Sequence, residues 1–362
     1  MNIYDTFYLL AAVQALPPEH TFFKKRYFPT DMTLDVFGTS KVLADYKGAG
    51  RKAAPFVLPR VGGVSVAREG FSTYELEPAN ISLSIPLTMD QLTKRGFGEA
   101  LMPGKTPAER AKLLQIGDLK ELSARIARTE EWMAVQTMLD NGCTMRHQTE
   151  TDGVYEDVPA KFYDGENNPA LFTPAAPWQH STVDASGKIT VGNWYKDICQ
   201  MIKMLTSRGL PARDLLMSSD VADFLMEDIY VQRMLDNRRT EMGSIDPKEL
   251  TEYVTEVGTF NFNGRKLSLL SSDGSFVDSK GNDTLYIPNG SVIVTAPDCG
   301  KGLYGGVTQL ENDGQYHTYA GTRVPQHIFT VKPPVKETQL TSRPLMVPKR
   351  EAPWSVAKKV FD

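Results

Sequence analysis

Residues 106–139, TPAERAKLLQIGDLKELSARIARTEEWMAVQTML, are the stretch that decides the fold. Thr106 is a favourable N-cap, and Pro107 suits the first helical position because its missing N–H would have no partner there. Asn141 and Gly142 follow, and both tolerate the left-handed backbone that ends a helix. We therefore predict one helix about 50 Å long, at 1.5 Å per residue.

Only a narrow face of this helix has the pattern of a buried surface. An interior glycine, Gly117, costs about 1 kcal/mol relative to alanine, so a helical hairpin broken there is the alternative. A long helix with one narrow buried face would act as a spine to which other parts attach. The inward positions are Leu119, Leu122, Ile126, Thr129 and Met133, and the charged residues expected on other faces are Lys120, Glu121, Arg125, Arg128 and Glu131.

Length and composition indicate a water-soluble protein with more than one structural unit. A chain of 362 residues exceeds what a single core usually serves. Its mean hydropathy is -0.31, and it has no apolar run near the roughly 18 residues of a membrane span. The start, MNIYDTFYLLAAVQAL, has an acidic residue where an export signal needs basic ones. We therefore expect a cytoplasmic product with free thiols and no membrane partner.

Charge is unevenly distributed along the chain. Residues 1–60 have eight Lys/Arg and five Asp/Glu, and residues 329–362 have seven and three. Because the net charge of the whole chain is -4, the region between them carries -11. Basic ends that lie on the acidic bodies of neighbouring copies would explain this pattern, but so would basic tails that face nucleic acid.

Residues 1–68 combine aromatic anchors with little sustained periodicity after a short amphipathic helix over 2–16. Such a stretch cannot form a core of its own, so we expect an arm that crosses to a neighbouring subunit. A basic run within aromatic residues could also bind nucleic acid, but no nucleic-acid-binding motif accompanies it, and an interface anchor is favoured. The candidate interface residues are Phe22, Phe23, Lys24, Lys25, Arg26, Tyr27 and Phe28.

Residues 72–89, STYELEPANISLSIPLTM, alternate apolar and polar side chains as strands do. They predict two strands joined at residues 78–80, or one long strand kinked there. Nothing nearby in sequence covers the apolar side of these strands. We therefore expect a protruding loop whose Leu83 and Ile85 pack on an adjacent subunit.

The rest of the chain predicts an α+β domain and a returning strand. The pair Asn263-Gly264 is a strong hairpin signal, and Asp246-Pro247-Lys248-Glu249 has the pattern of a capping box that opens a helix. The last strand contains Pro344, which favours an edge position along the spine. Helices are expected at 194–207, 219–235 and 246–257, and strands at 154–162, 188–191, 215–217, 259–262, 266–270, 284–287, 292–296 and 339–347.

No motif predicts catalysis, a cofactor or a metal. Residues 300–305, GKGLYG, match GxGxxG, but no amphipathic helix follows to hold a phosphate. The five histidines lack metal-ligand spacing. Glu130 and Glu131 are adjacent on the spine, hence about 100° apart and too divergent for an acid–base pair. We expect them to form ion pairs with Arg125, Arg128 or the arm of another subunit.

The order of these elements resembles the Hong Kong 97-type viral capsid fold, and the sequence resembles the lambda-type major capsid protein family of tailed phages. The likeness covers nearly the whole chain. The segments that carry it are LLAAVQAL at 9–16, RYF at 26–28, KV at 41–42, APFV at 54–57, EP at 77–78 with Ile81, GE at 98–99, RTEEWMAVQTMLDNG at 128–142, FNGRKLSLL at 262–270, IPNGSVIVTAP at 287–297 and SRPLMVP at 342–348.

The resemblance implies a division of the chain and a function. Its regions would be an N-terminal arm 1–68, an extended loop 69–105, a peripheral domain 106–195 with the spine helix, an axial domain 196–325, and a C-terminal strand 326–362 that returns to the peripheral domain. The family implies hexamers and pentamers of an icosahedral shell around double-stranded DNA. It also implies a scaffold protein during assembly in the host cytoplasm, a possible decoration protein, and no catalysis.

The sequence is therefore interpreted as a structural subunit of a virion shell. The competing interpretation is a soluble two-domain α+β cytoplasmic enzyme of unknown chemistry, which only the size and the soluble character of the chain favour.

Overall fold

The structure is a computed structural model in which the described residues are 9–10, 13, 21–47, 71–88, 107–148, 154–163, 168–235, 243–278, 281–311, 314–330 and 335–361. Within these ranges the helices are α2 (Phe23–Tyr27), α4 (Pro107–Asp140), α5 (Asn193–Ser207), α6 (Ser219–Glu227) and α7 (Ile229–Leu235). The strands are β1 (Val42–Lys47), β2 (Phe71–Leu76), β3 (Ile81–Leu87), β4 (Gly142–Gln148), β5 (Tyr155–Lys161), β6 (Leu171–Phe172), β7 (Thr182–Val183), β8 (Ile189–Thr190), β9 (Asp214–Ser218), β10 (Gly243–Thr251), β11 (Val254–Phe262), β12 (Arg265–Ser272), β13 (Ser275–Val277), β14 (Asp283–Leu285), β15 (Val292–Thr295), β16 (Gly300–Tyr304), β17 (Val307–Leu310), β18 (Tyr316–Tyr319), β19 (Val324–Thr330), β20 (Val335–Ser342), β21 (Pro344–Pro348) and β22 (Ser355–Ala357).

The long helix α4 confirms the predicted spine. It has 34 residues and continues through Gly117, so the broken hairpin is excluded. Asn141 follows with a φ of 54°, the left-handed conformation expected at the end of a helix. Thr106, the predicted N-cap, lies outside the described residues. None of the described helices is both long and apolar enough to cross a membrane.

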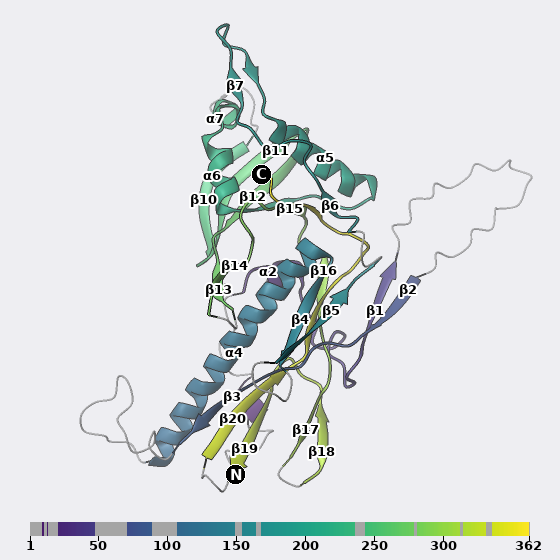
Figure 1. Cartoon of the computed structure of the whole chain (residues 1–362), viewed down its shortest axis with the longest axis vertical. Coiled ribbons are helices and arrows are strands. Elements are labelled where there is room, and N and C mark those ends of the chain that lie inside the picture. Colours follow the sequence, from purple (N-terminus) through teal and green to yellow (C-terminus); the bar gives the residue numbers. More distant parts are fainter. Residues whose placement is uncertain are drawn as a thin grey trace, which may run out of the picture.

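The chain divides into two halves (Figure 1). The upper half, here called the sheet half, contains a seven-stranded sheet with the order β10-β11-β12-β9-β15-β22-β6. The lower half, here called the spine half, consists of α4 and several smaller sheets. These include the three-stranded sheet β19-β20-β3, which lies along the helix, and the pairs β16-β21, β17-β18 and β4-β5.

The central strand β9 shows how the two halves meet. All five of its residues are buried, and successive side chains point to opposite faces of the sheet. Leu215 and Met217 pack with α5 and α6 in one apolar core. Leu216 points the other way, into a second core that contains Met133 and Met138 of α4. One face of the large sheet is therefore covered by helices of its own half, and the other by the end of the spine.

A hairpin of β1 and β2 projects from the body (Figure 1). Val42 pairs with Leu76 and Lys47 with Phe71, so the described strands of this hairpin are residues 42–47 and 71–76. The expected boundary between residues 68 and 69 lies outside the described residues, and the division into an arm over 1–68 and a loop over 69–105 stays a prediction. The strand pattern of 72–89 was interpreted correctly, but its two strands pair with β1 and β20 rather than with each other.

Leu83 and Ile85 face their own subunit, which corrects the expected contact with a neighbour. Strand β3 alternates half-buried and exposed residues, and its inner side packs against Leu119, Leu122 and Ile126 of α4. The partner strand β20 lies more than 240 residues further along the chain. Such a contact is invisible to a search for neighbours in sequence.

Of two helix predictions in the sheet half, the one over 246–257 was wrong and the one over 219–235 was wrong in part. Residues 246–249 belong to β10, an edge strand whose register shifts between Ile245 and Lys248. A bulge at an edge accommodates Pro247, so pairing with β11 overrides the local helix signal. The helix expected over 219–235 is divided at Asp228 into α6 and α7. The hairpin at Asn263-Gly264 is confirmed, with φ values of 50° and 82°.

The C-terminal region does return along the spine, as predicted. Strand β20 lies in the middle of its sheet, and β21, which contains Pro344, pairs on one side with β16. Met346 packs with Met133 and Val135, whereas Leu345 and Val347 point to a different cluster. Beyond them β22 enters the seven-stranded sheet. The end of the chain therefore joins both halves instead of only the spine half.

The GxGxxG sequence forms strand β16 instead of a phosphate loop, and two of its glycines allow a close approach. A Cβ on Gly300 would lie 2.2 Å from the ring of Phe28, and one on Gly302 would lie 2.5 Å from Thr30 Oγ1. Glycine is therefore needed at both positions because Phe28 and Thr30 lie too close to this strand to leave room for a side chain.

Candidate functional site: the carboxylate junction on the spine

Glu130 of α4 is fully buried and is surrounded by charge partners. Arg323, which precedes β19, contacts it with two nitrogens, Nη1 to Oε1 at 2.7 Å and Nη2 to Oε2 at 2.8 Å. Lys24 Nζ lies 2.8 Å from Oε2, and the Tyr304 hydroxyl donates to Oε1 at 2.8 Å. Two cations and a phenol thus saturate one carboxylate.

These charges control the protonation of Glu130. Burial by itself would raise its pKa, but the positive charges of Arg323 and Lys24 outweigh burial and hold the pKa at about 2. Glu130 is therefore ionised across the physiological range. Removing it would leave two cations buried without their counter-ion, a costly arrangement.

Glu131 binds backbone instead of side-chain cations. Its Oε2 accepts from the N–H of Phe23 at 2.8 Å and of Phe22 at 3.2 Å, and its Oε1 accepts from the N–H of Lys24 at 2.9 Å. The Tyr253 hydroxyl donates to Oε2 at 3.1 Å. These N–H groups lie at the start of the five-residue helix α2. The first N–H groups of a helix have no hydrogen-bond acceptor within the helix, and no side chain at the N-cap of α2 supplies one. Glu131 acts as the cap of that helix from another part of the chain.

The next residues of α2 contact the sheet half. Arg26 makes a two-point ion pair with Asp214 at the start of β9, Nε to Oδ2 at 2.7 Å and Nη2 to Oδ1 at 3.0 Å. The hydroxyl of Tyr27 donates to Asp214 Oδ2 at 3.1 Å. Residues 21–28, here called the anchor segment, therefore connect the spine to the central strand of the large sheet.

The aromatic residues of the anchor segment lie inside the subunit. Phe23, Tyr27 and Phe28 are 0% exposed and Phe22 is 7% exposed. Phe28 packs against Trp354, and Phe23 against Tyr253 and Tyr286. Their predicted role as anchors on a neighbouring subunit is corrected, because a fully buried ring presents no surface to another chain.

The structure also corrects the predicted partners of the charged residues. Glu130 and Glu131 pair within the chain, and Arg125 instead bonds Glu121 one turn away. Lys24 and Arg26 are engaged with Glu130 and Asp214. Lys25 is exposed, and its contact with a neighbour stays a prediction. One sequence signal was available: Glu130 follows Ile126 by four residues and so shares its buried face.

The junction links the spine helix to distant parts of the same chain. Both carboxylates are at most 2% exposed, and every donor that contacts them belongs to the chain itself. No His, Cys, Asp and Glu cluster suited to a metal ion occurs among the described residues. Sequence reasoning missed Arg323, Tyr304 and Tyr253, because each lies more than 100 residues from the spine and carries no motif.

The fold defined by this spine, its two halves and the projecting hairpin is the Hong Kong 97-type viral capsid fold. The crystal structure of a putative capsid protein of a prophage of Escherichia coli CFT073 matches with a TM-score of 0.64 at 15% identity, covering 98% of each chain. The capsid of Ralstonia phage GP4 matches with a TM-score of 0.52 at 10% identity, covering 95% of this chain and 92% of that one.

Sequence comparison supplies the family. The family model described as phage major capsid protein E matches residues 5–358, and the chain belongs to that family. The major capsid protein of Enterobacteria phage P21 is 23% identical over 354 residues, which cover 96% of both chains, and so is the P21 prophage-derived major head protein of Escherichia coli O6:H1. The chain is thus a major capsid protein of a phage, and the alternative of an α+β enzyme is not supported.

Proposed function

We propose that this chain assembles through hexamers and pentamers into an icosahedral shell that encloses double-stranded DNA. The observation that carries the proposal is the family match over residues 5–358, on a fold with a hairpin that projects beyond its own core. A strand pair that leaves the body gains most of its burial from other chains. The role proposed is purely structural.

Different parts of the chain hold one subunit together and make contacts between subunits. The carboxylate junction uses its charges within the subunit, so it holds the two halves of each copy together. The hairpin over residues 42–76 and exposed cations such as Lys25 remain for contacts between copies. Assembly in the host cytoplasm with a scaffold protein, and later binding of a decoration protein, are part of the same proposal.

Negative-stain microscopy of the expressed protein, with and without its scaffold, tests the proposal. Closed shells or capsomer rings are the expected products, and the shells should admit DNA without preference for its sequence. Compact monomers at all protein concentrations, in the presence of the scaffold, would contradict a shell function.

A further inference from the structure

The first half of α4 has a second apolar surface, on the side that faces away from the sheet of β3 and β20 (Figure 1). Leu113 is 49% exposed, Ile116 is 41% exposed, and Gly117 beside them is exposed as well. Lys112, Ile116 and Lys120 follow at steps of four, and Leu113 and Gly117 form the next such row. Residues four apart are neighbours on a helix, so these five residues, here called the outer face, are contiguous.

Gly117 has no packing role inside the subunit. A Cβ placed there would meet no atom within 4 Å. Glycine in the interior of a helix is destabilising relative to alanine, and α4 continues through this position as a regular helix. A missing side chain does allow the backbone of another element to approach closely. The outer face therefore has the form of a shallow groove between Leu113 and Ile116.

The charge around the outer face is positive. The described and exposed charged side chains over 109–128 carry a net charge of +2; they are Glu109, Lys112, Lys120, Glu121, Arg125 and Arg128. Arg125 and Glu121 neutralise each other in an ion pair. No ion pair within the described part of the chain neutralises Lys112 or Lys120. Two cations thus stand at the two ends of the row that contains Ile116.

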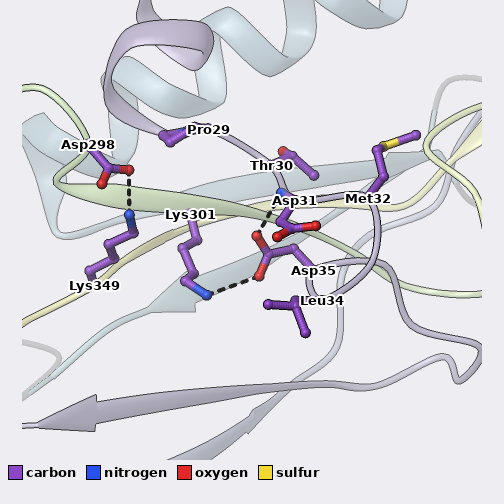
Figure 2. A pocket seen from close by; sticks show the side chains of 9 residues that line it. All are labelled: Pro29, Thr30, Asp31, Met32, Leu34, Asp35, Asp298, Lys301 and Lys349. Carbon is purple, nitrogen blue, oxygen red and sulfur yellow. Dashed lines mark hydrogen bonds and ion pairs between the residues drawn. The ribbon is translucent and has the colours of Figure 1, made fainter.

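A second exposed apolar surface of the subunit has the opposite charge. The pocket beside the anchor segment has the exposed side chains of Met32 and Leu34 in its lining, together with three carboxylates and two ammonium groups (Figure 2). Both ammonium groups are paired with carboxylates, as Lys301 is with Asp35 at 3.1 Å. The pocket keeps a net charge of -1. An acidic partner would therefore be attracted to the outer face and repelled by the pocket.

Geometry and charge together select the occupant of the outer face. Rows at steps of four are the ridges and grooves through which helices pack on one another. A second copy of α4 would place the same cations opposite Lys112 and Lys120, and like charges repel. DNA phosphates would meet Leu113 and Ile116, which have no hydrogen-bond donors to offer.

We infer that the outer face of α4 binds an acidic amphipathic helix of another protein, with the apolar side of that helix packed across Gly117. In the proposed shell function this partner is the scaffold protein. The inference rests on that function and names the surface of the subunit at which the scaffold would bind.

A labelled peptide tests the outer face on the free subunit. The probe has about six helical turns, with leucine at alternating steps of three and four and glutamate at the remaining positions. Its fluorescence anisotropy should rise with the wild-type subunit, and Leu113→Asp should raise the dissociation constant at least tenfold. Leu310→Asp is the matched control, because Leu310 is also 49% exposed, and its dissociation constant should stay within twofold of wild type.

A second peptide controls for nonspecific attraction. It has the same composition, but its leucines are spread around the helix, and it should not bind. Equal binding of the two peptides, no binding of the probe by wild type, or unchanged binding by Leu113→Asp would each overturn the inference. Circular dichroism of each variant confirms that the subunit is folded.

Gly117→Ala provides a test with two opposite signs. Alanine favours the helix, so the melting temperature of the free subunit should rise. Its methyl group fills the groove, so the dissociation constant of the probe should increase at least threefold. A higher melting temperature with an unchanged dissociation constant would contradict docking across Gly117.

Photo-crosslinking identifies the occupant in assembled particles. Benzoylphenylalanine in place of Lys112, at the edge of the outer face, should link the subunit to the scaffold when shells form in its presence. Links only to a second copy of this chain, or only to DNA, would overturn the inference and leave the shell function standing. Failure of the wild-type protein to form shells while the probe still binds would overturn the shell function and leave the binding surface standing.

Discussion

The anchor segment at 21–28 and the hairpin at 42–76 come from the same stretch of sequence but have opposite structural roles. Both contain aromatic and basic residues, and a strand-like alternation begins only at residue 72. The anchor segment is nevertheless buried against Glu130, Glu131 and Asp214, whereas the hairpin extends away from the core. Composition identifies residues that need burial, but it does not say whether their own chain or another provides it.

The largest loss of subunit stability is expected from deleting residues 1–28. This removes the anchor segment together with Leu9 and Val13, which pack on the first half of α4. It removes the partners that Glu130, Glu131 and Asp214 have in the anchor segment, so the two halves lose one of their connections. The truncated protein should lack a cooperative transition in circular dichroism or calorimetry. A soluble truncation with a melting curve like that of wild type would contradict the role of the anchor segment.

Loss of folding on this deletion would differ from the sequence-based expectation, in which residues 1–68 act on a neighbouring subunit. Helix caps, turn residues and apolar periodicity predicted α4, α5 and the hairpin at Asn263-Gly264, because each of these signals depends on residues close together in sequence. They failed at Pro247, where pairing with β11 decides, and at Leu83, whose partners lie on α4 and β20. The carboxylate junction could be predicted only to the extent that Glu130 shares the face of Ile126. Its partners are too distant in sequence to be found.

Glu130→Ala should destabilise the subunit by about 3–5 kcal/mol, since Lys24 and Arg323 would stay buried without a counter-ion. Denaturant unfolding of the free subunit measures this change. Glu121→Ala is the matched control on the same helix, because Glu121 is exposed and forms an ion pair with Arg125 at the surface. Similar losses from the two variants would mean that the buried network contributes no more than a surface pair.

The contribution of Glu130 to subunit stability should also depend on pH. The pKa of Glu130 is lowered in the folded state from 4.5 to about 2, so its contribution is present above pH 4.5 and is lost as the pH falls toward 2. At 1.36 kcal/mol per unit the full contribution is about 3 kcal/mol. The stability difference between wild type and Glu130→Gln should therefore shrink between pH 5 and pH 2.5. Protonation of Glu131 occurs in both proteins and cancels; a constant difference would refute the argument.

Substitutions on the solvent-facing side of α4 should change subunit stability only slightly. Arg125 and Glu121 form an ion pair one turn apart, and both side chains are 55% exposed. Exposed pairs of this kind contribute about 0.3–0.5 kcal/mol and weaken with salt. Arg125→Ala should change the free energy of unfolding by no more than this, and shell assembly should be normal. A loss of several kcal/mol would show that Arg125 has a partner outside its own helix.

Shortening the hairpin tests directly whether it acts between subunits. Ala44 and Tyr74 are cross-strand partners, so residues 45–73 can be replaced by Asn-Gly, a two-residue turn that suits such a pair. The free energy of unfolding of the shortened subunit should lie within about 1 kcal/mol of the wild-type value, as expected for a change outside the core. The variant should form no closed shells in negative-stain microscopy. Closed shells of normal size from this variant would contradict the claim that the hairpin, unlike the anchor segment, acts between subunits.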